Sequence, residues 1–236
     1  MSSIQLLFSP GCRFTDDTVM TVATIDSLLH GKPFAESYKA WYQKYPDVGY
    51  GRSFQQWARS AGYEPYYSWG NGSAMRVSPV GFYYQSLDDV LDIAKESAAA
   101  THNHPEGIKG AQAVSSAIFL ARQGETKAQI KEYVESKFGY ALDEPLASIR
   151  EWYQFDVSCQ GSVPQAITAF LESADVEDAV RNAVSIGGDS DTIACIAGAI
   201  AEAYYKSIPD FVMTEVKKRL DHDMLLIIEA FYEIMK

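Results

Sequence analysis

Two short acidic clusters contain the residues best suited to chemistry. The first, T-D-D-T, occupies residues 15–18, and the second, G-G-D-S-D-T, occupies residues 187–192. Each places two carboxylates and a threonine hydroxyl just before an apolar run with helical spacing. Hard oxygen ligands gathered this closely suit Mg²⁺, Mn²⁺ or Ca²⁺ and do not suit Zn²⁺. If the fold brings the clusters together, we expect one or two hard cations in a cleft.

An ordinary structural role competes with metal binding at both clusters. Aspartate and threonine are common N-caps that complement the helix dipole, and capping is the better interpretation of either cluster taken alone. However, a cap needs one carboxylate, whereas each cluster supplies two. Asp189 and Asp191 follow two glycines and lie two residues apart, so both can point at one place. The pairing therefore favours metal binding.

A glycine-rich loop, W-G-N-G-S-A-M-R at residues 69–76, is a second candidate site. Its glycines and Ser73 can expose backbone N–H groups to a phosphate, and Arg76 can add charge-assisted hydrogen bonds. The alternative is a tight structural loop in which Arg76 pairs with a surface carboxylate.

A third candidate, T-H-N-H-P-E-G at residues 101–107, holds two of the four histidines. A transition-metal site there would lack a further soft ligand. Hydrogen bonding of His102 or His104 to a ribose or phosphate is the better functional interpretation. Helix capping by Thr101 or Asn103 is the structural alternative.

Aromatic residues crowd the stretch 38–84. An aromatic ring there can stack on a purine, but we expect most of these rings in core or loop packing. The pattern favours no single one of them as a binding residue.

The elements that must position these motifs are helices. Helical periodicity dominates the chain, with no convincing alternating strand pattern and no internal repeat. The run over 193–205 is apolar nearly all round, which predicts a helix buried on every face. Other helices are predicted over residues 18–30, from Ser86 or Asp88, over 110–123, 126–138, 162–171 and 176–186, and as one or two helices over 211–235. The segments predicted to be irregular are 1–14, 46–81, 101–107 and 143–161.

Composition limits the class of protein. The 236 residues are enough for one sizeable core, and we expect a single domain over residues 1–236. A net charge of −11 argues against a nucleic-acid-binding patch or an anionic membrane surface, so a phosphate ligand must be met by local devices. Cys12, Cys159 and Cys195 support neither a disulfide framework nor a zinc site. With no signal peptide and no apolar run long enough to span a bilayer, we expect a cytoplasmic location.

Four motifs, taken in order, resemble those of the ADP-ribosylglycohydrolase family, the group related to the dinitrogenase-reductase-activating glycohydrolase. They are F-T-D-D-T-V-M at 14–20, G-N-G-S-A-M-R at 70–76, T-H-N-H-P at 101–105 and G-G-D-S-D-T at 187–192. The first and last, as an ordered pair followed by apolar helices, are the most specific. The resemblance implies a compact, all-α, multi-helix orthogonal bundle with two Mg²⁺ or Mn²⁺ ions in a cleft.

The resemblance also implies the reaction and the roles of individual residues. The family is a group of hydrolases that cleave the glycosidic bond between ADP-ribose and a side chain or small molecule. By resemblance, the metal ligands are Thr15, Asp16, Asp17, Asp189, Asp191 and Thr192. The implied substrate-binding residues are Asn71, Gly72, Ser73, Met75, Arg76, His102 and His104. Asp16 and Asp17 are the candidates for proton transfer.

One departure from the family pattern concerns the start of the chain. The family carries a glycine-rich first helix and a catalytic acidic residue before the T-D-D motif, whereas residues 1–14 contain no acidic residue. Three explanations stay open: a longer reading frame, a natural short form that binds ADP-ribose without efficient cleavage, or a base supplied by Asp16 or Asp17. A missing helix would expose apolar surface, which we expect near the buried helix after Thr192, covered by a partner or second subunit.

Three functions therefore follow from the sequence. The leading one is a metal-dependent hydrolase acting on an ADP-ribose-bearing protein or small molecule. The alternative is a catalytically impaired module that binds ADP-ribose or a nucleotide, or has a regulatory role, and retains the metal site. The third is a structural all-α protein in which the aspartates only cap helices.

Overall fold

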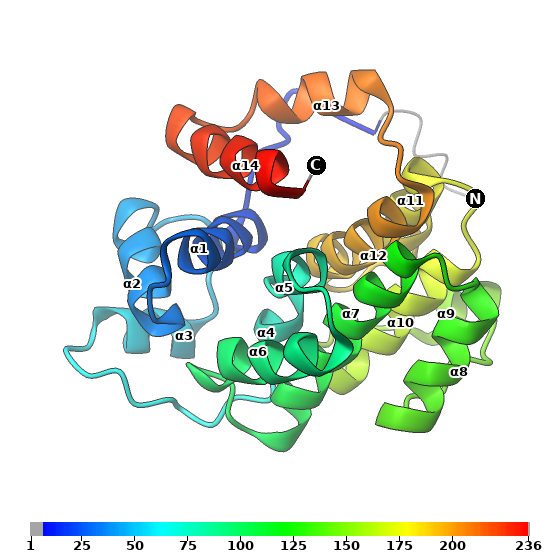
Figure 1. Ribbon diagram of the computed structural model, residues 1–236. Coiled ribbons are helices and arrows are strands. Elements are labelled where there is room, and N and C mark those ends of the chain that lie inside the picture. Colours follow the sequence, from blue (N-terminus) through cyan, green and yellow to red (C-terminus); the bar gives the residue numbers. More distant parts are fainter. Residues whose placement is uncertain (1–6, 236) are drawn as a thin grey trace.

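The structure is a computed structural model that describes residues 7–235, and throughout that part of the chain it is built from helices (Figure 1). No strand occurs among these residues, and the only bridge they form outside a strand joins Gly70 to Ser158. The predicted all-α fold is therefore confirmed. The helices are, in chain order, α1 (Asp16–His30), α2 (Phe34–Lys44), α3 (Arg52–Arg59), α4 (Gly72–Met75), α5 (Ser78–Tyr83), α6 (Leu87–Ala99), α7 (Pro105–Gln123), α8 (Lys127–Phe138), α9 (Leu146–Trp152), α10 (Cys159–Leu171), α11 (Val176–Ile186), α12 (Ser190–Tyr205), α13 (Asp210–Lys217) and α14 (His222–Met235).

Helix α12 lies at the centre of the larger apolar cluster. It packs against α7, α10 and α11, and Figure 1 shows it enclosed by these helices. No residue from Thr192 to Tyr205 is exposed, although several are half-buried. The prediction of a helix buried on every face is thus confirmed only in part, because the half-buried residues, among them Ala194, Gly198 and Glu202, recur at helical spacing along one side. Small residues such as Ala197 and Ala201 allow the neighbouring helices to approach closely.

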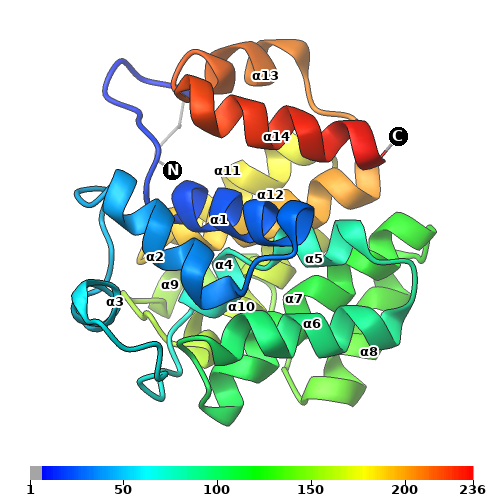
Figure 2. The ribbon, with the colours of Figure 1, turned by 60° about the vertical axis from the view of Figure 1, so that its left-hand side comes forward.

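A second apolar cluster joins α1, α2 and α3, which lie side by side in Figure 2. Aromatic rings fill most of it, among them Tyr38, Trp41 and Trp57. Leu28 and Ile93 border both clusters, so α1 and α6 connect the two parts of the interior. The aromatic stretch of the sequence is therefore mainly core, as expected. The prediction of one domain over residues 1–236 stays a prediction.

Several helix limits were predicted correctly because local chemistry sets them. Helix α1 ends where Gly31 takes a left-handed conformation with φ 63°. Ser86 caps α6, and Thr126 opens α8 with a reciprocal capping box. The tail forms two helices, α13 and α14. The segment 7–14 is irregular, whereas residues 1–6 of that predicted segment lie outside the described part.

Other limits were predicted wrongly. The segments 46–81 and 143–161 are not irregular throughout, because they contain α3, α4, α9 and the starts of α5 and α10. Helix α10 begins at Cys159, since the Ser158 hydroxyl accepts a hydrogen bond from the Gly161 N–H at 3.0 Å. Pro164 therefore lies inside the helix and not in its first turn. Because proline has no N–H, the carbonyl of Gln160, four residues earlier, receives no helical hydrogen bond from position 164.

The start of α7 was also placed wrongly, five residues too late. The His104 ring nitrogen Nδ1 accepts a hydrogen bond from the Glu106 N–H at 3.1 Å, and Pro105 fills the first helical position. Proline suits this position because its fixed φ is helical and its missing N–H would have no partner. His104 is therefore the N-cap, a role that the sequence analysis gave to Thr101 or Asn103.

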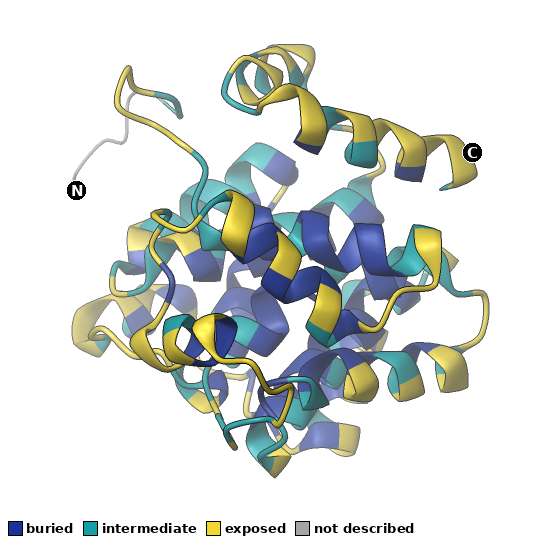
Figure 3. Ribbon diagram, turned by 90° about the vertical axis from the view of Figure 1, so that its left-hand side faces the viewer, coloured by how far each residue is buried: buried dark blue, intermediate teal, exposed yellow. Residues whose placement is uncertain are grey.

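Exposed apolar side chains gather on the two C-terminal helices. None of the residues of α13 is buried, and Phe211, Leu226 and Ile234 are each at least half exposed. Figure 3 shows α13 and α14 as largely exposed ribbons at one end of the molecule. Exposed apolar surface was expected near α12. Besides the residues on α13 and α14, Trp152, Phe155 and Val157 are exposed on the segment whose Tyr153 packs over Gly188, just before α12. In residues 7–235 no helix is both long enough and apolar enough to cross a membrane, and the cytoplasmic location stays a prediction.

Close packing of α7 on α10 yields a prediction about glycine. A Cβ added at Gly110 would lie 2.4 Å from Cys159 Sγ, whereas one at Gly198 would meet only Val180 Cγ2 at 3.3 Å. We expect Gly110→Ala to lower the free energy of unfolding by about 1–3 kcal/mol through overpacking. Gly198→Ala should leave it unchanged or raise it by up to about 1 kcal/mol, because alanine favours the helix. Denaturant unfolding of both variants measures this; equal effects would contradict it.

Candidate metal centre

The first acidic cluster lies at the start of α1 without capping it. Thr15 occupies the N-cap position, yet no side chain accepts a hydrogen bond there. Its hydroxyl instead donates to Asp17 Oδ2 at 2.8 Å. The N-cap of α12 is Asp189, and it too makes no capping hydrogen bond. These contacts contradict the interpretation that the aspartates are present only as side-chain caps.

The two clusters converge, although 172 residues separate Asp17 from Asp189 in the chain. Burial raises the pKa of Asp16 to about 7, and the Asp17 carboxylate beside it adds to the effect. Burial raises the pKa of Asp17 to about 6, with the Asp191 carboxylate as the next cause. Burial likewise raises the pKa of Asp189, which lies against Asp191. Four carboxylates thus repel one another across the starts of α1 and α12.

Threonine hydroxyls and one amide give these carboxylates their hydrogen bonds. The buried Thr192 side chain faces Asp17 and Asp189, and its hydrogen bonds offset part of the rise in their pKa values that burial causes. The Asn71 side-chain nitrogen donates to Asp189 Oδ2 at 2.6 Å and to Ser162 Oγ at 2.9 Å. The glycine-rich loop is therefore attached directly to the second acidic cluster, through the residue between its two glycines.

The donor set fits a hard divalent cation. Asp17 is 5% exposed, and its Oδ1 is buried with no hydrogen-bond partner. A buried carboxylate oxygen without a partner is costly, and a cation removes that cost. As the side chains lie, no group of three or more His, Cys, Asp or Glu in the described chain has metal-binding geometry. Asp17 and Asp189 are turned towards hydroxyl and amide partners, so the six predicted ligands stay a prediction.

Two tyrosines beside the carboxylates were missed. Tyr50 lies close to Asp16, whose backbone N–H donates to Val48 O at 3.0 Å. On the opposite side, Tyr153 packs over Gly188, where an added Cβ would lie 2.5 Å from the ring. Tyr50 belongs to the aromatic stretch in which the sequence favoured no single ring. Only the three-dimensional structure distinguishes it.

Arg76 lies in the interior of the molecule, and contact of its guanidinium with a phosphate stays a prediction. It is 1% exposed, and its guanidinium donates to Ser97 O at 2.9 Å and to Thr101 Oγ1 at 2.8 Å. The guanidinium also lies 4.0 Å from the centroid of the Tyr38 ring. With no exposed face, it does not reach a phosphate in this structure. Arg76 thus links the loop that carries Asn71 to Ser97 of α6 and to Thr101.

Other residues of the loop also point inward. The Ser73 hydroxyl donates to Gly107 O at 2.8 Å, which ties α4 to α7. Met75 is buried, and its carbonyl accepts from Cys195 Sγ at 3.4 Å. Gly72 is half-buried beside the His102 ring. The structure thus brings Asn71 to the acidic cluster, while the side chains of Ser73 and Met75 support the loop.

The two predicted histidines pack against the same loop: His102 lies beside Gly72, and His104 lies against Trp69. His102 is buried, its Nδ1 lies 2.7 Å from Thr101 Oγ1, and burial holds its pKa well below the usual range. Its imidazole is therefore neutral and can accept or donate one hydrogen bond at Nε2. The half-buried His104 ring packs edge-on against Tyr67 and Trp69. Contact of either histidine with a ribose or phosphate stays a prediction.

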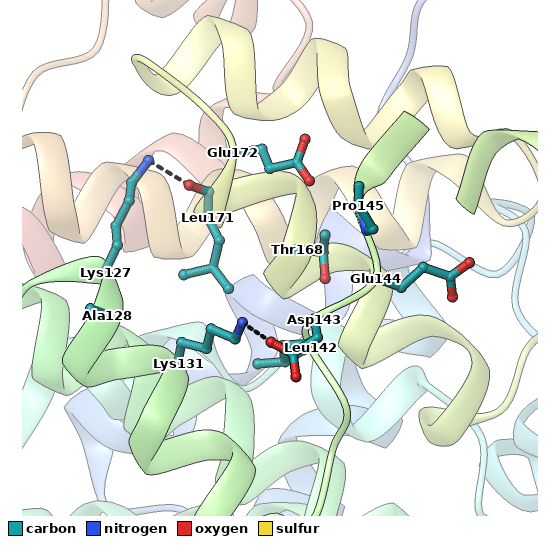
Figure 4. Close-up of a pocket in the computed structure, with 10 residues that line it drawn as sticks. All are labelled: Lys127, Ala128, Lys131, Leu142, Asp143, Glu144, Pro145, Thr168, Leu171 and Glu172. Atoms are coloured by element: carbon teal, nitrogen blue, oxygen red, sulfur yellow. Dashed lines mark hydrogen bonds and ion pairs between the residues drawn. The ribbon is translucent and has the colours of Figure 1, made fainter. Parts of the chain in front are cut away.

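A hollow elsewhere on the surface is a poor candidate site. It has a volume of about 300 Å³ and lies between α8, α10 and the 142–145 loop (Figure 4). Its two lysines already have partners: Lys127 donates to Leu171 O at 3.1 Å, and Lys131 pairs with Asp143 at 2.5 Å. None of the residues of the acidic clusters lines it. This hollow is therefore separate from the acidic clusters at the starts of α1 and α12.

An all-helical fold with paired aspartates at the starts of two helices and a glycine-rich loop between them defines the class. The ADP-ribosylglycohydrolase family model matches residues 3–235, and the chain belongs to this family of ADP-ribosyl hydrolases. The resemblance found in the four motifs is thereby confirmed.

Individual relatives agree with this assignment. Human ADP-ribosylhydrolase ARH3 is 31% identical in an alignment that covers 81% of this chain and 70% of that protein. An uncharacterized protein of Archaeoglobus fulgidus is 30% identical, with 88% of this chain and 76% of that protein covered. A solved structure titled "ADP-ribosylglycohydrolase-related protein complex" superposes with a TM-score of 0.71 at 26% identity, covering 94% and 82% of the two chains. The chain is similar to each of them in sequence or fold.

The raised pKa values predict how stability depends on pH without metal. Because the folded pKa values of Asp16 and Asp17, about 7 and about 6, exceed the ordinary 3.8, the folded state holds protons that the unfolded chain releases. The free energy of unfolding should therefore rise as the pH falls from about 8 to about 5, because the folded state takes up these protons first. Asp17→Asn should reduce the gain in melting temperature over this range. An unchanged gain in chelator-treated protein would contradict the assignment.

Arg76 offers a direct test of its internal role. Arg76→Lys keeps the charge but removes the planar guanidinium, whose Nη2 donates to both Ser97 O and Thr101 Oγ1 and whose face lies on the Tyr38 ring. We expect the free energy of unfolding to fall by about 1–3 kcal/mol, because buried hydrogen bonds are lost. Denaturant titration measures this. A variant with unchanged stability and weakened ADP-ribose binding would instead indicate a phosphate contact.

Proposed function

We propose that this protein is a metal-dependent hydrolase that cleaves the glycosidic bond between ADP-ribose and a modified side chain or small molecule. The observation that carries the proposal is the convergence of four carboxylates from α1 and α12 beneath the loop that carries Asn71. Family membership and the similarity to human ADP-ribosylhydrolase ARH3 support the same reaction class. ADP-ribose is the released product.

The residues that would hold the metal are those of the two clusters. Asp16, Asp17, Asp189 and Asp191 supply hard oxygen donors, and Thr15 and Thr192 add hydroxyl oxygens, as Mg²⁺ and Mn²⁺ prefer. When bound, two such ions supply charge stabilisation and orient the ribose hydroxyls and a water molecule. The partnerless Asp17 Oδ1 supports this ligand set.

The chain's own groups account for proton transfer. Hydrolysis joins a water oxygen to the anomeric carbon, so one proton leaves that water and one reaches the departing group. Asp16 and Asp17 are the carboxylates of α1 that would border the reacting water. Burial raises their pKa values in the metal-free site, and a bound cation would lower them and favour the carboxylate form that accepts a proton. We assign proton transfer to this pair.

Substrate positioning falls to the loop and its neighbours. Asn71 already binds Asp189, so a ligand held on this loop sits close to the carboxylates. Neutral His102 supports Gly72 from below, and half-buried His104 borders the exposed Tyr67 and Trp69 rings. These contacts support a role of the loop in holding ADP-ribose.

A second candidate is an ADP-ribose-binding module without efficient turnover. The two candidates share the metal site and differ in whether the glycosidic bond breaks.

A hydrolysis assay separates these candidates. With Mg²⁺ or Mn²⁺, the wild-type protein should release ADP-ribose from an ADP-ribosylated arginine or serine peptide. Asp17→Ala and Asp189→Ala should each reduce the rate by at least about 100-fold, because a metal ligand is lost. Lys131→Ala, on the distant hollow, is the matched control and should retain full activity.

Calorimetry with ADP-ribose completes the test. Metal-dependent binding without product release would support the binding module. If neither product release nor metal-dependent binding is found while a longer relative is active under the same conditions, both candidates fail.

A further inference from the structure

Tyr50 carries a buried hydroxyl group without a partner. The residue is 4% exposed, and its hydroxyl oxygen makes no hydrogen bond. Leaving such a group unpaired costs about 1–3 kcal/mol, so a buried unpaired hydroxyl calls for a reason. Phenylalanine would fill the same space without this cost.

Packing fixes the Tyr50 ring. The ring stacks on Phe54, with centroids 5.2 Å apart and planes 18° apart, and meets the Tyr42 ring at 5.0 Å and 63°. A ring held on two sides cannot turn its hydroxyl towards solvent without disrupting the cluster. The position of the hydroxyl is therefore set before any ligand binds.

The segment that carries Tyr50 wraps around Asp16. Val48 O accepts the Asp16 backbone N–H at 3.0 Å, and a Cβ added at Gly49 would lie 3.2 Å from Asp16 Oδ1. The Tyr50 side chain also lies near the Asp16 carboxylate. A tyrosine hydroxyl carries its proton at neutral pH, so it is a hydrogen-bond donor next to a predicted metal ligand.

We infer that Tyr50 is a positioning residue whose hydroxyl donates a hydrogen bond to the Asp16 carboxylate when the acidic cluster holds its metal ion. This inference rests on the proposed metal-dependent function. A carboxylate that binds a metal retains acceptor capacity, and groups outside the coordination shell commonly fix its orientation through hydrogen bonds. The Tyr50 hydroxyl is a donor without a partner, and the Asp16 carboxylate beside it is an acceptor.

A pair of tyrosine-to-phenylalanine variants tests the inference. Tyr50→Phe removes the hydroxyl and keeps the ring. The matched control is Tyr42→Phe in the same cluster, whose hydroxyl accepts a hydrogen bond from Arg59 Nε at 2.7 Å. Isothermal calorimetry with Mn²⁺ and thermal unfolding in chelator are measured on wild type and both variants.

The two variants should show opposite effects. We expect Tyr50→Phe to weaken Mn²⁺ binding by about tenfold or more, the usual effect of losing such a partner. Its melting temperature in chelator should be unchanged or higher, since an unpaired buried hydroxyl is removed. Tyr42→Phe should melt at a lower temperature and bind Mn²⁺ with wild-type affinity.

Each other outcome has a defined meaning. If Tyr50→Phe binds Mn²⁺ as tightly as wild type, the hydroxyl does not position Asp16 and the inference is overturned. Equal losses of Mn²⁺ affinity in both variants would show a general effect of the aromatic cluster and would also overturn it. If the wild-type protein binds no Mn²⁺, the proposed metal-dependent function itself fails.

Discussion

Repulsion among buried carboxylates is the constraint on which the site depends. Asp16 and Asp17 enter from α1, and Asp189 and Asp191 enter from α12, and the hydrogen-bond partners found for them are neutral hydroxyl and amide groups. Such an arrangement disfavours folding unless the rest of the protein forces it. The packing of α12 forces it. This helix has no exposed residue from Thr192 to Tyr205, and its contacts with the surrounding helices fix its first turn relative to α1. Stability of the core is thus used to hold an unfavourable charge arrangement, as is common at functional sites.

The glycine-rich loop shows how one short segment serves both the interior and the site. Arg76 and Ser73 point inward and bind α6, the Thr101 hydroxyl and α7. Asn71 points the other way and binds Asp189. The inward contacts fix the loop, and the outward one couples it to the carboxylates. A substitution on the buried side can therefore alter the site without touching a ligand.

Local chemistry explains how much of this was predictable from sequence. Caps and glycine stops at Ser86, Thr126 and Gly31 act within a few residues, so those helix limits were correct. The ordered acidic motifs were predictable because they retain family spacing, and the chain belongs to that family. The orientation of Arg76 was not predictable, since an arginine after a glycine-rich loop looks the same whether it faces a phosphate or Tyr38. Tyr50 was missed for a similar reason: its role depends on which face of the aromatic cluster meets Asp16.

Charge also orders the binding events under the proposed function. The protein has a net charge of −11, and ADP-ribose carries a negatively charged diphosphate. Without a cation, four carboxylates repel that group, and the buried guanidinium of Arg76 offers it no exposed positive charge. A divalent ion reverses the sign of the local field, so metal and ADP-ribose should favour each other's binding. Because coupling between two ligands is reciprocal, ADP-ribose should tighten metal binding by the same factor that the metal tightens ADP-ribose binding. Under the proposed function, the acidic cluster would bind the diphosphate only after it has bound its cation, and this order would allow an acidic protein to bind an acidic ligand.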